Sequence, residues 1–275
     1  MQIGYNTNGF AHHRLEDAMD IIADLGYRCV AITPDYHALN PYDRDIAKQT
    51  EAIRDRLAER GLGSVIETGA RFLLDPMRKH SPTLLDRRGG GRQRRLDFLQ
   101  RCVDLAAELR SPTVSLWSGA LPRGQDESVA FDLLAEGCRA LADHAAERTV
   151  TLAFEPEPGM LVDTLAKFER LAGAVDRDNF RLTIDIGHLA CSEAEPPADL
   201  IRRSAPRLAN VHLDDMRRGV HDHLFFGEGD VDFAAVFAAL AEAGYAGPAC
   251  VELSRHSHDA VETARRAREF IDRFL

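Results

Sequence analysis

The sequence predicts an α/β fold of the (β/α)8 TIM-barrel type. Short runs of apolar and β-branched residues alternate with longer amphipathic segments along all 275 residues. Most of the short runs are continuously apolar, which is typical of strands buried on both faces of a parallel sheet. No linker rich in Pro, Gly and Ser divides the chain, whose length suits eight strand–helix units. We therefore expect a single TIM-barrel domain over residues 1–275; a doubly wound open sheet is the alternative.

The predicted strands are short and suit a buried, pleated surface. In order, they are Gln2–Asn6, Cys29–Thr33, Ser64–Glu67, Thr113–Leu116, Thr151–Glu155, Arg181–Asp185, Ala209–His212 and Ala249–Glu252. The predicted helices are longer and amphipathic. They are Leu15–Leu25, Asp45–Arg60, Arg94–Leu109, Phe131–Glu147, Leu165–Ala174, Phe233–Ala243 and Ala260–Phe274, with a weaker segment at Pro197–Ser204.

One predicted connection is unusually long. Residues Thr68–Arg92 join the third strand to the third helix and contain a glycine triplet, Gly89–Gly91. A connection longer than about 15 residues in a compact domain is often functional. We expect it to close over the carboxyl ends of the strands as a lid, with the triplet as its hinge. A mobile surface loop and a subunit-contact loop are the alternatives.

Composition argues against several kinds of partner. The formal net charge of −10 disfavours broad attraction to nucleic acid or to an anionic membrane. The first residues lack a basic region followed by a long apolar run, and no segment approaches a membrane span. Five scattered cysteines without a CxxC pair indicate reduced thiols. We expect a soluble, cytoplasmic protein.

Four side chains that can bind a metal follow strand-like runs in the second half of the chain. The runs read TLAFE, RLTID, LANVH and ACVE, and a parallel barrel would bring their carboxyl ends to one face. Three carboxylates and one imidazole suit one divalent ion, for which we predict Mn²⁺, with Mg²⁺, Co²⁺ and Zn²⁺ as alternatives. Surface salt bridging is the competing interpretation. The four residues are Glu155, Asp185, His212 and Glu252.

This arrangement suggests proton-transfer chemistry. The metal would have positions open for two neighbouring oxygens of a polyol or hydroxyketone, where it would polarise a carbonyl and stabilise an enediolate. Glu155 and Glu252 come from well-separated strands. One could remove a proton from one face of a substrate carbon while the other returns a proton to the opposite face.

Five motifs occur in order in the second half of the chain: FEPEPG, TIDIGHL, NVHLDD, GEGDVDF and CVELS. They resemble the xylose-isomerase-like barrel superfamily, which includes ketose 3-epimerases, hydroxypyruvate isomerase, inosose dehydratase and the apurinic endonucleases. The resemblance implies metal binding at the four residues above, an acid/base pair of Glu155 and Glu252, and a possible homo-oligomer. It also implies that His188 contacts substrate oxygens, as does an arginine that matches Arg218 or Arg217.

Two departures from the epimerase pattern leave alternatives open. FEPEPG lacks the usual asparagine, so Glu157 either replaces a substrate contact or points to solvent. The motif His221–His223 stands where the endonuclease branch places ligands of an additional zinc, and His223 aligns with one of them. That branch also has histidines after its third and fourth strands, where this chain has Glu67–Gly69 and Trp117–Gly119. We therefore do not expect a three-zinc centre.

Further residues are expected on the same face. Trp117 could form a flat wall against a sugar or cap the barrel core, and either Arg71 or Arg123 could bind a substrate phosphate. The basic run Arg87–Arg95 is a solvated helix start or, if ordered over the site, a place for an anionic substrate. The residues predicted to bind substrate are His188, Arg218, Arg217, Trp117, Arg71, Glu157 and His223.

The sequence thus predicts a divalent-metal-dependent isomerase or epimerase of a sugar, sugar phosphate or related polyol. Its partner would be this small molecule, with neither nucleic acid nor membrane involved. The alternatives are a metal-dependent phosphodiesterase of the apurinic endonuclease branch and a cyclic-polyol dehydratase. A barrel that binds a metabolite without turnover is the third alternative.

Overall fold

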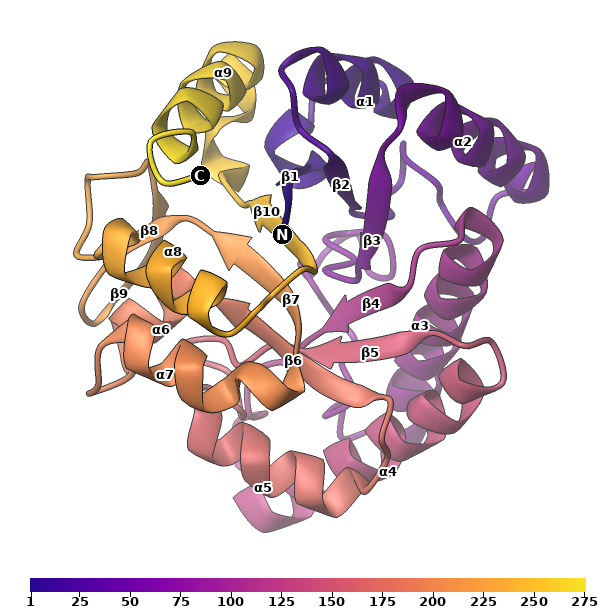
Figure 1. Cartoon of the computed structure of the whole chain (residues 1–275). Coiled ribbons are helices and arrows are strands. Elements are labelled where there is room, and N and C mark those ends of the chain that lie inside the picture. Colours follow the sequence, from indigo (N-terminus) through magenta and orange to yellow (C-terminus); the bar gives the residue numbers. More distant parts are fainter. The chain divides into compact units, whose positions relative to one another are not determined.

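Eight parallel strands form a closed barrel in the computed structural model of the chain (Figure 1). Their order around the barrel is β1-β10-β7-β6-β5-β4-β3-β2, and β8 and β9 form a separate two-stranded sheet. The structure describes all residues, 1–275. The predicted (β/α)8 TIM-barrel fold is confirmed.

The strands are β1 (Gln2–Asn6), β2 (Cys29–Ile32), β3 (Gly63–Glu67), β4 (Thr113–Leu116), β5 (Thr151–Phe154), β6 (Phe180–Asp185), β7 (Leu208–Leu213), β8 (Asp215–Arg217), β9 (Val220–Leu224) and β10 (Pro248–Val251). The α-helices are α1 (Leu15–Asp24), α2 (Ile46–Arg60), α3 (Gly89–Leu109), α4 (Glu127–Ala146), α5 (Leu165–Val175), α6 (Ile186–Ser192), α7 (Pro197–Ser204), α8 (Phe233–Glu242) and α9 (Ala260–Ile271). Short 3-10 helices are η1 (Thr7–Phe10), η2 (Ala205–Arg207) and η3 (Ser254–Asp259).

The chain divides into two compact units, and each is described by itself. The first unit comprises Met1–Ile32, Asp55–Val65 and Leu182–Leu275. In it, β1 pairs in parallel with β2 and β10, β10 pairs with β7, and β7 pairs with β6. Helices α7 and α8 pack side by side, and α6 contacts the antiparallel hairpin of β8 and β9 (Figure 1). That the whole chain acts as one domain stays a prediction.

The second unit comprises Thr33–Arg54 and Ile66–Arg181. In it, β4 pairs in parallel with β3 and β5, and α4 contacts both α3 and α5. The register places Leu116 of β4 opposite Phe154 of β5. The residues that follow them along the chain, Trp117 and Glu155, therefore lie at neighbouring strand ends.

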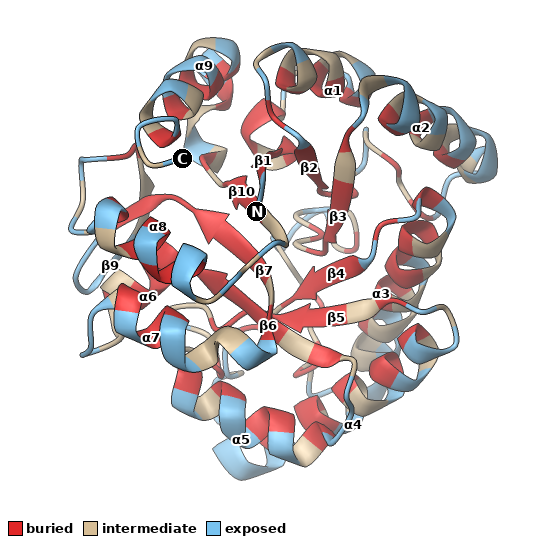
Figure 2. Ribbon diagram, in the orientation of Figure 1, coloured by how far each residue is buried: buried red, intermediate tan, exposed pale blue.

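Burial explains why these segments form strands and helices. Every residue of β2 and of β4 is buried, including Thr113 and Ser115, as expected for parallel strands covered on both faces. Figure 2 shows buried residues along the strands and on one side of the helices, with exposed residues on the other side. In α1 the buried residues Leu15, Ala18, Met19 and Ile22 follow the spacing of a helical face.

The glycine triplet differs from its prediction. Gly89–Gly91 form the first turn of α3 and are not a hinge in the preceding loop, so the helix begins before the predicted start at Arg94. The Gly91 amide donates to the carbonyl of Arg88 at 3.0 Å, as in a helical turn. A Cβ on Gly91 would lie 2.5 Å from Cγ of Asp86, so the close approach of the loop requires glycine there.

Two further observations bear on earlier expectations. The helices of this fold lack the combination of length and apolarity that crossing a bilayer requires. All five cysteines are buried free thiols.

Candidate metal centre

Three side chains that can bind a metal converge in the first unit. Asp185 ends β6 and is paired in register with His212 of β7, while Glu252 directly follows β10, the other neighbour of β7. Each residue offers one ligand atom, and these atoms all lie within 4.8 Å of one another. The parallel pairing of three neighbouring strands therefore assembles the group from residues far apart in the sequence.

The geometry of this group fits a divalent ion. His212 Nδ1 lies 2.9 Å from Glu252 Oε2. Two ligand atoms bound at right angles to one ion, each at about 2.1 Å, would be about 3 Å apart. Asp185 is 2% exposed and His212 is 1% exposed. Buried acids are costly unless a positive charge compensates them, so the donor set and its burial both suit a cation.

The second nitrogen of His212 is held by Asn210. The Asn210 side-chain amide lies 3.1 Å from His212 Nε2. The atom nearest Nε2 is the amide nitrogen of Asn210. A metal at Nδ1 would require the proton on Nε2, and the amide would then turn its oxygen toward Nε2 to accept it. Asn210 is fully buried and lies two residues before His212, on the same strand. It therefore fixes the orientation of the imidazole.

Asp185 is positioned by the start of α6. Its Oδ1 accepts a hydrogen bond from the His188 amide at 2.8 Å, which makes Asp185 the N-cap of the helix. The ring of His188 packs back toward the same carboxylate, with Nε2 3.9 Å from Oδ2. The three-residue spacing of Asp185 and His188 in the motif DIGH therefore follows from helix capping, in which the N-cap side chain accepts from an amide of the first turn.

Asn8 contacts the carboxylate oxygen of Glu252 that does not face His212. Its side-chain amide donates to Glu252 Oε1 at 2.7 Å. Burial raises the pKa of Glu252, but the nearby imidazoles of His212, His223 and His188 lower it more, so the pKa lies below its ordinary value. Asn8 was not predicted from the sequence, although it lies two residues after the end of β1, which pairs with β10.

Three imidazoles form a second group in the first unit. His188, His221 and His223 each offer a nitrogen, and these atoms lie within 4.8 Å of one another. Burial lowers the pKa of His188 well below its ordinary value, and the charges of His223 and His221 lower it further. Burial also lowers the pKa of His223, but the carboxylate of Asp214, 2.6 Å from its Nδ1, outweighs this and raises the pKa to about 10.

Two buried aspartates explain the motifs around this group. Asp214 accepts from the Gly187 amide at 3.1 Å as well as from His223. Asp215 accepts from the amides of Gly227, Gly229 and Val231 at 2.8–3.1 Å, and so folds GEGDV around its carboxylate. Both aspartates belong to the motif NVHLDD, but their roles were not predicted.

The other predicted first-unit residues make contacts of their own. The Arg217 guanidinium donates to the carbonyl of Glu228 at 3.2 Å, and that of Arg218 donates to the carbonyl of Glu193 at 2.8 Å. Both arginines are exposed. Their role in substrate binding stays a prediction.

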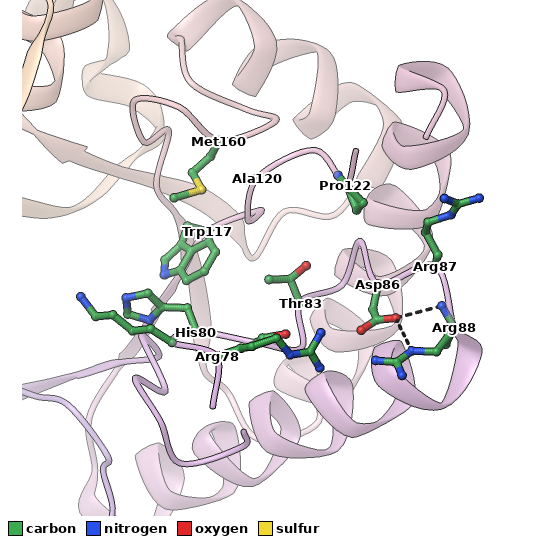
Figure 3. A pocket seen from close by; sticks show the side chains of 12 residues that line it. Arg78, His80, Thr83, Asp86, Arg87, Arg88, Trp117, Ala120, Pro122 and Met160 are labelled. Atoms are coloured by element: carbon green, nitrogen blue, oxygen red, sulfur yellow. Dashed lines mark hydrogen bonds and ion pairs between the residues drawn. The ribbon is translucent and has the colours of Figure 1, made fainter. Parts of the chain in front are cut away.

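In the second unit, Glu155 is buried and follows β5, where its amide donates to the carbonyl of Leu116 at 2.8 Å. Glu157 lies in the next turn, and its amide donates to the carbonyl of Val162 at 3.1 Å. Arg71 lies 3.7 Å from Asp35 in an ion pair. Trp117 lines an open cavity together with His80 and other residues (Figure 3).

The chain is thus a closed parallel barrel whose strand ends carry side chains that could bind a metal. The chain belongs to the xylose isomerase-like TIM barrel family, whose profile matches residues 10–274. This confirms the resemblance drawn from the sequence motifs.

Two curated relatives are enzymes. An inosose dehydratase of Lacticaseibacillus casei is 30% identical over 161 residues, covering 52% of this chain and 54% of that protein. The L-ribulose-5-phosphate 3-epimerase UlaE of Salmonella paratyphi C (strain RKS4594) is 30% identical over 137 residues, covering 50% of this chain and 48% of that protein. The chain thus spans about half the length of these curated relatives.

Solved structures share the fold along the whole chain. An L-ribulose 3-epimerase has a TM-score of 0.80 at 22% identity, covering 100% of this chain and 94% of that one. The IOLI protein with a bound zinc atom has a TM-score of 0.80 at 16% identity, covering 100% of this chain and 99% of that one. At these identities the likeness concerns the fold.

Proposed function

We propose that this chain is a divalent-metal-dependent isomerase or epimerase of a sugar, sugar phosphate or related polyol. The observation that carries the proposal is the group of Asp185, His212 and Glu252, whose ligand atoms lie within 4.8 Å of one another at the ends of neighbouring strands. Carboxylates this close, of which Asp185 is buried, repel each other unless a cation compensates them. The similarity to a sugar-phosphate 3-epimerase supports the reaction type.

Glu155 is the fourth ligand in this proposal. It is buried and directly follows β5, as Glu252 directly follows β10. Oxygen donors predominate in the set, which favours Mn²⁺ or Mg²⁺, while the imidazole also suits Co²⁺ and Zn²⁺. We propose Mn²⁺ as the resident ion. A solved protein of the same fold holds a zinc atom, which supports a metal centre in this chain.

Proton transfer is assigned to the two glutamates. A bound divalent ion would polarise the substrate carbonyl and stabilise negative charge as it develops. Glu252, held by Asn8 at 2.7 Å, accepts the proton from the carbon next to that carbonyl. Glu155, initially protonated, donates a proton to the opposite face of the substrate. The two carboxyl groups exchange protonation states in each turnover, so the reverse reaction uses them in the opposite order.

The remaining site residues orient the substrate. In this proposal His188 and His223 contact its oxygens, together with Arg218 or Arg217. Trp117 forms an apolar wall, and Arg71 and Glu157 contact the substrate from the loops after β3 and β5.

The location we propose is the cytoplasm, and the partner is a small-molecule substrate. Buried free thiols at all five cysteines suit a reducing compartment. The net charge of −10 disfavours nucleic acid as a substrate.

Metal analysis and solvent exchange test the proposal together. Purified protein should bind a single divalent ion per chain by elemental analysis. In D2O it should introduce deuterium next to the carbonyl of at least one member of a panel of ketoses, ketose phosphates and inososes. A protein without tight metal binding and without exchange on the whole panel would contradict the proposal. Asp185→Ala serves as the metal-free control.

A dehydratase of a cyclic polyol ketone is the second candidate. The similarity to an inosose dehydratase supports it. Both reactions begin by removing a proton next to a carbonyl, so both would show exchange. Loss of water from an inosose, followed by proton NMR, identifies the dehydratase.

A phosphodiesterase of the endonuclease type is the remaining alternative. The group of His188, His221 and His223 supports it, because three imidazoles can bind a further zinc. The absence of histidines at Glu67–Gly69 and Trp117–Gly119 argues against it. Two or three zinc ions per chain would favour the phosphodiesterase, and one ion favours the isomerase.

A further inference from the structure

An open cavity of about 590 Å³ lies in the second unit, next to the end of β4. The loop between β3 and α3 contributes most of its lining, and the loops after β4 and β5 contribute the rest. In Figure 3, Trp117 and Met160 lie at one side of the cavity, with Arg78 across from them and Arg87 and Arg88 at the far end. The cavity thus combines an apolar wall with a basic rim.

The charged side chains of the lining are mostly cationic. They are Arg78, Lys79, Arg87, Arg88 and Asp86. Burial lowers the pKa of His80, which also lines the cavity, to about 4, so this imidazole is neutral near pH 7. Because the whole chain has a net charge of −10, this excess of positive charge is local.

Two of these cations have no acidic partner. Arg78 pairs with Asp75 at 2.7 Å and Arg88 with Asp86 at 3.4 Å. Lys79 and Arg87 form no ion pair and no side-chain hydrogen bond, and both are exposed at the cavity. Their charges are therefore available to a ligand.

A buried cation lies behind the aromatic wall. Arg95 is 2% exposed, and its guanidinium carbon lies 5.3 Å from the centre of the Trp117 ring. It donates to the carbonyl of Thr68 at 2.6 Å, but it has no carboxylate partner. Burial lowers its pKa to about 10, so Arg95 stays charged near pH 7. A buried charge without a counter-ion is costly, and an anion beyond Trp117 would reduce that cost.

The cavity adjoins the strand end that carries Glu155. Leu116 and Phe154 are paired in register, so Trp117 and Glu155 follow them on strands roughly 5 Å apart. The Leu161 amide, next to Met160, donates to the carbonyl of Gly119 at 3.0 Å and so joins the loops after β4 and β5. A substrate whose reacting carbon is at Glu155 could therefore extend past Trp117 into the basic cavity.

We propose that this cavity binds an anionic end of the substrate, a phosphate or a carboxylate carried on the polyol chain. The proposal rests on the proposed function, because it takes Glu155 to be at the reacting carbon. It narrows the substrate class to anionic sugars, for which Lys79 and Arg87 supply charge and Trp117 packs against the carbon chain.

Matched substrates and a charge-removing variant test this inference. The holoenzyme is assayed with a neutral ketopentose, its 5-phosphate and a ketohexuronate. At least one anionic substrate should have a kcat/KM 10-fold or more above that of the neutral ketose. The preferred substrate shows whether the cavity binds a phosphate or a carboxylate. In Lys79→Gln/Arg87→Gln, KM for the preferred anionic substrate should rise about 10-fold, with little change for the neutral ketose.

The control variant removes the same charge elsewhere. Arg44→Gln/Arg94→Gln changes two exposed arginines that do not line the cavity, and it should leave the preference for the anionic substrate unchanged. Equal kcat/KM values for neutral and anionic substrates, or equal losses in both double variants, would overturn the inference and leave the proposed function intact.

Calorimetry with inorganic phosphate separates the two proposals. The anion site is supported if Lys79→Gln/Arg87→Gln weakens phosphate binding and the control variant does not. If the protein also fails the exchange assay, the proposed function is refuted while the anion site stands. Phosphate binding unaffected by the cavity variant would overturn the anion site.

Discussion

His212 Nδ1 lies 2.9 Å from Glu252 Oε2, although the two residues belong to different strands. The backbone sets this spacing, because His212 is paired with Cys250 in register and the Glu252 amide donates to the carbonyl of Leu213 at 2.9 Å. The two ligand atoms are thus spaced as one ion would require, through hydrogen bonds of the barrel itself. Variants of this pair should therefore affect the metal more than the fold.

Removing a ligand should abolish tight metal binding. We expect Asp185→Ala and His212→Ala each to lose the ion, because each removes one of four proposed protein ligands. Elemental analysis after dialysis measures the occupancy. Secondary structure by circular dichroism should be retained, since both side chains lie at the carboxyl ends of strands, where residues of barrel sites can change with little effect on the fold.

Exposed residues of the same types provide the control. Asp178→Ala and His37→Ala change exposed side chains that are not proposed ligands, and both variants should keep the metal. If Asp185→Ala or His212→Ala kept full occupancy, the proposed ligand set would be incorrect.

Removing an acid/base group should slow catalysis. Glu155→Gln and Glu252→Gln keep the size of the side chain and one oxygen, but neither amide can accept the substrate proton. We expect the rate to fall by about 10²–10⁴-fold, the usual contribution of a general acid or base. The comparison is valid for samples with equal metal content, and near-normal turnover in such a sample would remove that glutamate from the mechanism.

The barrel strands could be predicted because each is a short run rich in apolar or β-branched residues between helical patterns. The predicted strand Thr113–Leu116 has the same bounds as β4, and Gln2–Asn6 has those of β1. The hairpin of β8 and β9 was missed, since β8 has three residues and β9 reads VHDHL, without a strand-like apolar pattern. The buried carboxylate of Asp215 accepts hydrogen bonds from backbone amides and so shapes the loop that follows β9. Hydrophobic periodicity does not reveal such hydrogen bonds.

The position of the proposed ligands at strand ends was predictable for the same reason as the strands themselves; that they bind a metal stays a prediction. Asn8 was not predictable in this way, because it meets Glu252 across 244 residues of sequence. Only the pairing of β1 with β10 reveals the contact. The glycine triplet was misread because three consecutive glycines resemble a flexible loop, whereas they form the first turn of α3, where Asp86 packs against Gly91.

Asn8 should matter for turnover more than for metal content. Its amide donates to Glu252 Oε1 at 2.7 Å and limits the orientation of that carboxylate. We expect Asn8→Ala to lower kcat by about 10-fold, with the ion retained, because residues that orient a ligand typically contribute 10–100-fold. The pH–rate profile should also shift, since Glu252 loses a hydrogen bond to its charged form.

A surface change of similar size is the comparison for Asn8. Gln93→Ala alters an exposed amide at the start of α3 and should change neither kcat nor the pH profile. An Asn8→Ala enzyme with normal kcat and an unshifted profile would show that Asn8 has no positioning role.

Gly187 should be the least replaceable residue of the motif DIGH. A Cβ there would collide with Asp214 Oδ1 and lie 2.7 Å from Met216 Cγ, and Asp214 is held in place by the Gly187 amide and His223. We expect Gly187→Ala to lower the free energy of unfolding by about 1–3 kcal/mol, the usual cost of overpacking. Gly173→Ala is the matched control, because nothing lies within 4 Å of a Cβ built on this glycine of α5. It should be neutral or stabilise the protein by up to about 1 kcal/mol. Urea denaturation of both variants measures the difference, and equal stability would mean that Asp214 moves aside at no cost.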